Sequence, residues 1–358
     1  MMLYGAVAMM SLMASCYLLF RRANAIAPDV TSPVRLRRWT AVFFACMTLS
    51  HLWYLPIAFF TSSEAIMQGY LVGALLDFML LIPSAIVLLL VMLQDRRRPL
   101  WPVCLMVAPP IVGLAIGFAS HSIARLSLFY IYHLLLGIGL IIYMVREVRR
   151  YGRWLRDNYA DLEHKEVWQS FIVLAIILLV FGIYTFGVKG MTYHYLVQVN
   201  DIVLICYLLW RVETLSDLTI LSNEAEEELQ EGDESLLASS STIRNDIGLL
   251  LEKYCEKPQL YLQHDLNLLQ LAQAIGTNRF YLSQYFSSQD INYNAYINNL
   301  RINHFISLYR KAVADMRNFT AQELALESGF HSYRTFSEAF KHQTGQTVTV
   351  WMKGLKNS

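Results

Sequence analysis

The chain has 358 residues, of which 55% are hydrophobic and only 16% are charged. That length allows two or more domains, and that composition excludes an ordinary soluble protein. The formal net charge of +1 hides an uneven distribution, because residues 1–211 carry long apolar runs and residues 212–358 have a soluble composition.

A helix needs roughly 20 mostly apolar residues to cross a bilayer. Residues 1–20 lack the basic leader of a signal peptide, and Arg21 and Arg22 follow them instead of a cleavage site, so we interpret them as a retained first span. The sequence predicts seven transmembrane helices, which form a bundle. They lie at about 2–20, 39–61, 67–93, 100–119, 126–145, 169–188 and 194–211.

Basic residues gather in alternate loops, after spans one, three and five. These residues are Arg21, Arg22, Arg35, Arg37, Arg38, Arg96, Arg97, Arg98, Arg146, Arg149, Arg150, Arg153, Arg156 and Lys165. The only basic residues of the opposite loops are Arg125 and Lys189, and these loops are very short. Because positive charge stays on the cytoplasmic side, the N-terminus is expected outside and the C-terminus in the cytoplasm. A signal would then enter through the spans, the lipid or a partner protein.

Several polar side chains lie inside the predicted spans, where burying an ionisable group in hydrocarbon is costly. Asp77 and Asp201 lie in the third and seventh spans, and His51 and His133 lie in the second and fifth. One interpretation makes them a sensing site that holds a cationic group or relays a proton. The alternative is a set of hydrogen bonds between helices that only holds the bundle together.

Several enzyme classes lack their signatures in this sequence. The last span, 194–211, contains no lysine that could form a Schiff base with a retinal-type pigment. We find no nucleotide-binding glycine loop, no metalloprotease motif and no two cysteines at metal-ligand spacing. We therefore expect no enzyme activity, no cofactor and no metal site.

Residues 212–245 form the predicted linker, which is rich in acidic residues and serine. Seven acidic side chains lie between Glu224 and Glu234 without a basic one. A solvated tether that keeps the following domain off the anionic membrane surface is the simplest interpretation. A short coiled coil that joins two copies is the alternative, because Leu215, Leu218 and Leu229 belong to an approximate 3–4 spacing.

Residues 246–358 contain an internal repeat. The segment Leu271-Ala272-Gln273-Ala274-Ile275-Gly276 recurs as Leu324-Ala325-Leu326-Glu327-Ser328-Gly329. Each copy predicts a helix, a glycine turn and a second helix, because glycine permits the left-handed turn conformation. Asn267 and Thr320 begin the first helices as capping boxes, Asn278 and Ser332 cap the second helices, and one long helix over 293–315 joins the two units.

The motifs within this repeat are specific enough to indicate a protein family. Residues about 262–353 resemble the DNA-binding domain of the AraC family of bacterial transcription regulators. The residues that carry this resemblance include Leu271-Ala272, Gly276, Tyr281-Leu282, Phe286, Leu300-Arg301-Ile302, Leu324-Ala325, Gly329-Phe330, Ser332, Thr335-Phe336, Ala339-Phe340-Lys341 and Gly345. The resemblance implies an all-α chain, with two recognition helices that enter adjacent segments of the major groove about one turn apart.

The family's base-contacting positions fall on two short sets of residues. They are Phe280, Ser283 and Gln284 in the first recognition helix and Tyr333, Arg334, Ser337 and Glu338 in the second. Arg334 suits guanine, Gln284 adenine and Glu338 cytosine. Arg279, Arg301 and Lys341 are the phosphate candidates.

The chain departs from the family pattern at three positions. Gln284 stands where an arginine is usual, Val348 where a proline is usual, and Trp351 where a tyrosine is usual. Residues 246–358 contain 11 Lys and Arg against 9 Asp and Glu, a net charge of +2. Because non-specific DNA affinity rests on phosphate neutralisation, we expect it to be modest.

These features predict a membrane-embedded regulator in a bacterial cytoplasmic membrane. Its domains are a seven-span sensor (1–211), the linker (212–245) and the double helix-turn-helix domain (246–358). The expected partners are promoter DNA and lipid, with RNA polymerase as a further candidate, while the oligomeric state stays open between monomer and homodimer. Two alternatives remain: a transporter whose cytosolic domain regulates it, and a tether that holds DNA or protein non-specifically.

Overall fold

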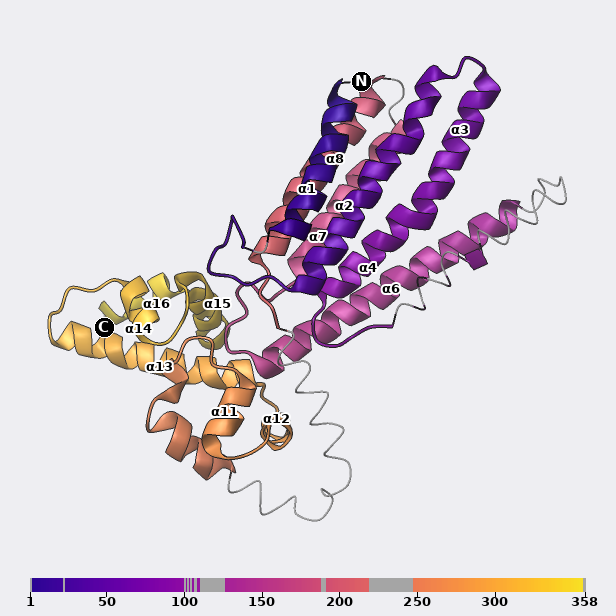
Figure 1. The fold of residues 1–358 in the computed structure, drawn as a ribbon. Coiled ribbons are helices and arrows are strands. Elements are labelled where there is room, and N and C mark those ends of the chain that lie inside the picture. The colour runs from indigo at the N-terminus through magenta and orange to yellow at the C-terminus, as the bar shows by residue number, and fades with distance from the viewer. Residues whose placement is uncertain are drawn as a thin grey trace, which may run out of the picture. The chain divides into compact units, whose positions relative to one another are not determined.

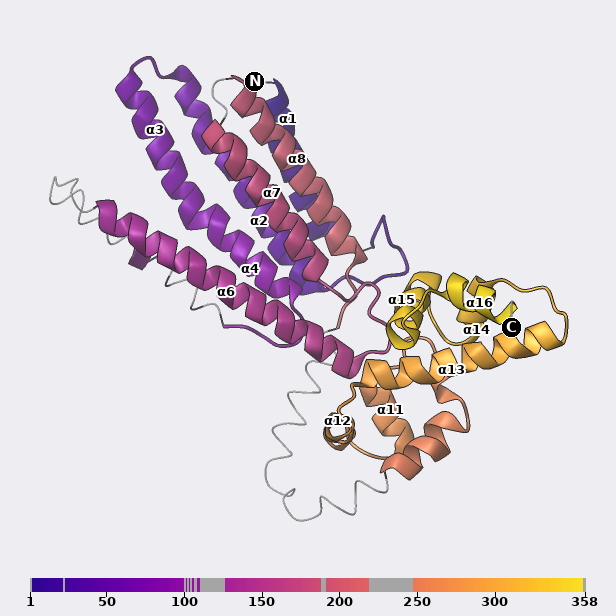
Figure 2. The same cartoon turned by 180° about the vertical axis from the view of Figure 1, so that it is seen from behind.

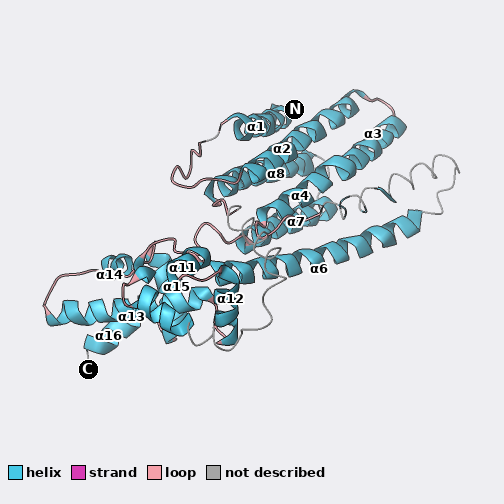
Figure 3. Cartoon of the chain, turned by 60° about the horizontal axis from the view of Figure 1, so that its bottom comes forward, coloured by secondary structure: helices cyan, strands magenta, loops and turns pink. Residues whose placement is uncertain are grey.

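The computed structural model describes residues 2–21, 23–99, 101, 103, 105, 108–109, 126–187, 191–218 and 247–356. Within these ranges every regular element is helical, and the single β-type pairing is an isolated antiparallel bridge between Tyr159 and Asn267 (Figure 3). The all-α fold class predicted from the sequence is confirmed. The contacts divide the chain into two compact units, which are residues 1–151 with 167–219, and residues 152–166 with 220–358.

The first unit is a set of long apolar helices. Four helical stretches are long and apolar enough to cross a membrane, at Met2–Phe20, Val34–Phe59, Ser63–Met92 and Thr192–Thr214. A shorter apolar stretch at Trp168–Val180 lies in α7 (Trp168–Gly187). Most of the predicted fourth span, 100–119, and the side chains of the predicted fifth span up to residue 134 lie outside the described residues. A count of seven spans therefore stays a prediction.

Small and polar side chains bring the first helices together. Helices α1 (Met2–Phe20), α2 (Val34–Tyr54) and α8 (Met191–Thr214) run side by side (Figures 1 and 2). The hydroxyls of Ser11 and Thr48 lie 2.8 Å apart, and Ser15 donates to the carbonyl of Ala41 at 2.8 Å. Small residues allow such a close approach of two backbones in a membrane bundle.

The third stretch changes its helical type in the middle. It consists of α3 (Ser63–Leu76), a π-helical turn over Asp77–Leu81 and α4 (Ile82–Met92). Pro83 follows this turn, and its ring would clash with a carbonyl of the preceding turn in a regular α-helix. The wider turn, in which the N–H of Ile82 donates to the carbonyl of Asp77, accommodates the proline.

Helix α6 (Leu126–Asn158) extends far beyond the apolar stretch predicted over 126–145. Its later turns carry charged residues, of which Glu147 is the buried one. Arg96 donates to Glu147 at 2.8 Å and Arg98 at 2.7 Å. These contacts fasten the segment after α4 to α6, and they hold the pKa of Glu147 below its ordinary value against the opposing effect of burial.

The second unit is built on two small apolar cores, one for each helix-turn-helix unit. The first core is filled by Leu271, Ile275, Leu282, Phe286 and Ile297 among others. The second is filled by Phe305, Leu324, Phe330, Phe336 and Phe340 among others. Leu282 and Phe286 in the first core, and Phe336 and Phe340 in the second, are four residues apart, so each pair lies on one face of its helix.

The glycine turns differ in what surrounds them. Gly276 has φ +74° and Gly329 has φ +87°, both in the left-handed region, as the repeat predicts. A Cβ on Gly276 would meet nothing within 4 Å, whereas a Cβ on Gly329 would lie 2.7 Å from the Cα of Leu262. Only the second turn is therefore pressed against another backbone segment.

We expect Gly329→Ala to destabilise the second compact unit, which contains both helix-turn-helix units, more than Gly276→Ala does. The left-handed conformation costs each alanine about 1–2 kcal/mol, and the contact with Leu262 adds about 1–3 kcal/mol at position 329 alone. Hydrogen exchange of peptides from residues 268–344, measured by mass spectrometry on the purified full chain in detergent, compares the two variants. Equal losses of protection would contradict the close approach at Gly329.

Candidate DNA interface

Two helix-turn-helix units form the C-terminal domain. The first consists of α11 (Leu268–Ile275) and α12 (Arg279–Ser288), and the second of α14 (Ala321–Glu327) and α15 (Tyr333–Thr344). The connector α13 (Tyr293–Ala314) joins them, and α16 (Val348–Lys356) closes the second unit (Figure 1).

The helix starts predicted from the sequence are confirmed. Asn267 and Thr320 form capping boxes with Gln270 and Glu323, in which the side chains and backbone N–H groups pair reciprocally. The side chains of Asn278 and Ser332 accept from the backbone at the third position of α12 and α15. These local hydrogen bonds set where each recognition helix begins.

The base candidates of α12 lie on its accessible side. The Phe280 side chain is 43% exposed, Gln284 is exposed and Ser283 is half-buried. Leu282 and Phe286 point into the first core. The placement of these residues on opposite faces matches a helix that packs on one side and is open to a partner on the other.

Helix α15 presents charged residues on its accessible side. Arg334 donates to Glu338 at 3.2 Å, and both side chains are about 70% exposed. Such an exposed pair contributes little stability, so Arg334 can exchange this partner for a guanine at small cost. Ser337 is half-buried, and Tyr333 packs partly on the second core through Phe336.

The three phosphate candidates differ in their surroundings. Lys341 is exposed at the end of α15. Arg279, at the start of α12, is half-buried and its Nε donates to the side chain of Asn158 at 2.9 Å. Arg301 is buried and only 1% exposed.

The sequence-based assignment of Arg301 to phosphate is wrong. Its guanidinium donates to the carbonyl of Tyr261 at 2.7 Å and to that of Gln263 at 2.8 Å, and it lies over the ring of Phe330. Burial lowers the pKa of Arg301, against the opposing effects of Tyr293, Asp161 and Asp265. Arg301 therefore joins α13 to the segment before α11 and to the second core, and it does not face solvent.

A sequence signal for this burial exists. Ile297, Arg301 and Phe305 recur at a spacing of four, so Arg301 shares the face of α13 that carries two fully buried apolar side chains. The assignment of Arg301 to phosphate rested on its positive charge and did not take this spacing into account.

The polar residues predicted inside the apolar helices partly come together. The imidazole of His51 lies 3.1 Å from the side-chain oxygen of Gln198 and 3.7 Å from the carboxylate of Asp201. The phenol of Tyr54 donates to Asp77 at 2.9 Å. The side chain of His133 lies outside the described residues. We name His51, Tyr54, Asp77, Gln198 and Asp201 the polar cluster of the apolar helices.

Comparisons with known proteins agree with the geometry of the C-terminal domain. Residues 271–354 match a family model described as a helix-turn-helix domain. Uncharacterized HTH-type transcriptional regulators of Staphylococcus aureus strains COL and MSSA476 are each 30% identical to this chain over 110 residues. That match covers 30% of this chain and 14% of each relative, so the chain aligns with about a seventh of their length. No solved structure matches the chain.

The C-terminal domain is thus a double helix-turn-helix domain of the DNA-binding type. Its motifs and its family match identify it as an AraC-type domain, as the sequence predicts.

Arg301 and Lys341 should respond differently to loss of charge. Arg301→Met leaves two carbonyls without donors and is expected to lower the stability of the domain by about 3 kcal/mol. Lys341→Met is expected to leave stability unchanged and to reduce the salt slope of DNA binding by about 1. Hydrogen exchange and a salt titration with a random-sequence duplex measure the two effects. A reduced salt slope with unchanged stability for Arg301→Met would restore it as a phosphate ligand.

Proposed function

We propose that the chain is a one-component transcription regulator embedded in a bacterial cytoplasmic membrane. The AraC-type domain with two accessible recognition helices supports sequence-specific binding to promoter DNA. The long apolar helices before it support membrane embedding, and the alternating loop charges support a cytoplasmic location of the domain. The observation that carries the proposal is the presence of both parts in one chain.

In this proposal Arg334 reads guanine, Gln284 reads adenine and Glu338 reads cytosine, while Phe280, Ser283, Tyr333 and Ser337 complete the two reading faces. Lys341 and Arg279 contact phosphates and set the position of the domain on the duplex. RNA polymerase is a further partner at the promoter, and the domain is not an enzyme. Two copies would pair on repeated half-sites if the regulator is a homodimer.

The polar cluster of the apolar helices is the proposed sensing site, and in this proposal it lies within the membrane. His51, Gln198 and Asp201 bring three polar side chains from α2 and α8 to one place inside apolar helices. Polar groups in hydrocarbon are costly and mark functional sites by default. A ligand or a proton that changes the contact of His51 with Asp201 would shift the balance between two packings of these helices.

The same cluster favours a second candidate, a proton-coupled transporter whose cytoplasmic domain regulates it. Mapping where the protein binds on chromosomal DNA separates the regulator from the transporter, since a transporter needs no discrete genomic sites. A tether that holds DNA non-specifically would bind without base preference.

Arg334→Ala is expected to alter base preference. The full chain, crosslinked to chromosomal DNA in cells and mapped by sequencing, should occupy discrete sites with two major-groove patches about one turn apart. Loss of the guanine contact should weaken discrimination at one base position by about 1–3 kcal/mol. Arg317→Ala, an exposed arginine that pairs with Glu327 away from both recognition helices, is the control. Occupancy without discrete sites would support the tether.

Asp201→Asn is expected to change transcription from the mapped promoters severalfold at an unchanged amount of protein in the membrane. The substitution removes the charge beside His51 while it preserves the size of the side chain. Asp29→Asn, the same change at an exposed position between α1 and α2, is the matched control. Reporter fusions measure the effect, and equal reporter output from both variants and the wild type would remove Asp201 from the sensing site.

A further inference from the structure

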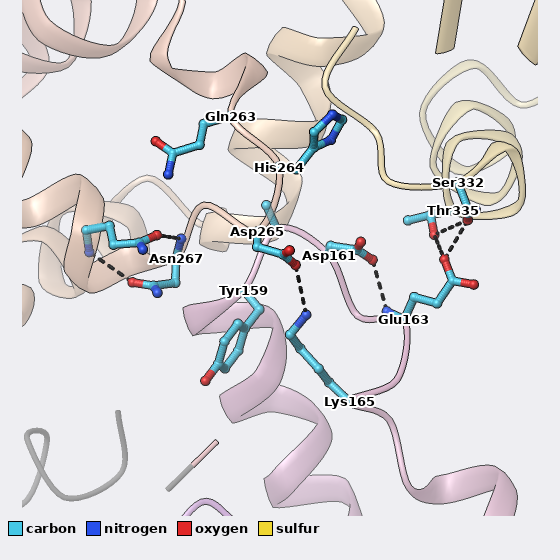
Figure 4. A network of polar contacts seen from close by, with 12 residues as sticks. Tyr159, Asp161, Glu163, Lys165, Gln263, His264, Asp265, Asn267, Ser332 and Thr335 are labelled. Carbon is cyan, nitrogen blue, oxygen red and sulfur yellow. Dashed lines mark hydrogen bonds and ion pairs between the residues drawn. The ribbon is translucent and has the colours of Figure 1, made fainter. Parts of the chain in front are cut away.

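The segment between α6 and α7 belongs to the same compact unit as the DNA-binding domain. Residues 152–166 are grouped with residues 220–358, although residues 167–219 separate the two stretches in the chain. Figure 4 shows residues 159–165 of this segment against residues from both helix-turn-helix units. We name residues 158–165 the docked loop.

The first helix-turn-helix unit holds the backbone of the docked loop. Tyr159 forms the antiparallel bridge with Asn267, the cap of α11. The amide of Asn294 donates to the carbonyls of Tyr159 and Ala160 at 3.1 and 2.7 Å. Ala160 is 1% exposed and is part of the first core. The docked loop is therefore packed into the domain at a defined register.

The side chains of the docked loop contact the beginnings of both recognition helices. Asn158 accepts from Arg279, the first residue of α12, at 2.9 Å. The carboxylate of Glu163 accepts from the hydroxyls of Ser332 and Thr335, at the start of α15, at 2.6 and 3.2 Å (Figure 4). An arginine and the hydroxyls at a helix N-terminus are ligands that proteins use for DNA phosphates.

The charge of the loop fits this position. The docked loop, residues 158–165, contains Asp161, Glu163 and Lys165, a net charge of −1. The backbone N–H of Glu163 donates to Asp161 at 2.9 Å, which fixes the turn that presents the Glu163 carboxylate. Although partial burial opposes ionisation, the hydroxyls of Ser332 and Thr335 and the nearby His164 and His331 hold the pKa of Glu163 below its ordinary value. Glu163 is thus an anion at neutral pH.

We propose that the docked loop is an acidic competitor of DNA built into the chain. It occupies backbone-phosphate positions at the start of both recognition helices, so it must leave before the domain binds DNA. The base-reading side chains Gln284 and Arg334 stay accessible, which restricts the competition to phosphate contacts. This inference rests on the proposed function and names how the DNA-binding site is regulated.

The position of the docked loop in the chain supplies the connection to the membrane. It follows α6 directly and is followed by α7 from Trp168 onward, and these helices contain the fifth and sixth predicted spans. A change in either helix reaches the docked loop through a few covalent links. The apparent DNA affinity then depends on the fraction of molecules from which the loop is released.

Glu163→Gln tests the proposal in the full chain, purified in detergent. It removes the negative charge and weakens both hydroxyl contacts, so a labelled random-sequence duplex should bind about three- to tenfold more tightly than to the wild type. Asn158→Ala, which removes the acceptor for Arg279, should act in the same direction. Glu327→Gln is the matched control, because it makes the same charge change at an exposed residue of the second helix-turn-helix unit.

Hydrogen exchange of α13 on the same samples verifies that each variant is folded. Binding by Glu163→Gln that is no tighter than binding by Glu327→Gln overturns the proposal, and weaker binding would show that the docked loop supports DNA binding instead. The mapped genomic sites separate this inference from the proposed function. If Glu163→Gln and Glu327→Gln bind the random duplex equally and the wild type still occupies discrete genomic sites, only the competitor proposal is refuted. If Glu163→Gln binds more tightly but the wild type occupies no discrete genomic sites, only the sequence-specific regulator is refuted.

Discussion

The buried guanidinium of Arg301 is the interaction on which the DNA-binding domain depends. A buried charge is costly unless it is hydrogen-bonded, and Arg301 donates two hydrogen bonds, to the carbonyls of Tyr261 and Gln263. The same residue lies over Phe330 of the second core, beside the turn where Gly329 meets Leu262. The ring nitrogen of His264 lies 3.2 Å from the carbonyl of Gly329 and adds a further contact there. These contacts join the two helix-turn-helix units that carry α12 and α15.

The docked loop contacts both of the helix-turn-helix units that these interactions join. Its backbone is held by the first unit through Asn294, and its Glu163 side chain reaches the second unit at Ser332. The docked loop therefore contacts both helix-turn-helix units at once.

The long apolar helices of the first compact unit bring polar side chains together in apolar surroundings, where a polar group without a partner is costly. His51 contacts Gln198 and Asp201 across α2 and α8, and Tyr54 donates to one carboxylate oxygen of Asp77 next to the π-helical turn. Pro83 and the π-helical turn interrupt regular packing beside this cluster. A site of this kind combines polar contacts that a signal can alter with a helix whose hydrogen-bond pattern is already irregular.

The sequence by itself determined the local features of this protein. The capping residues Asn278 and Ser332, the left-handed glycines and the repeated segment act over a few residues, so their patterns predicted the helices and turns of both helix-turn-helix units. Hydropathy likewise located the long apolar helices, because each helix satisfies its own backbone. Only the tertiary structure decided which polar side chains meet. Ser332 binds Glu163 across 169 positions of the chain and His51 meets Gln198 across 147, and Arg301 turned out to be buried. Such contacts depend on how distant helices pack, and no local pattern encodes that packing.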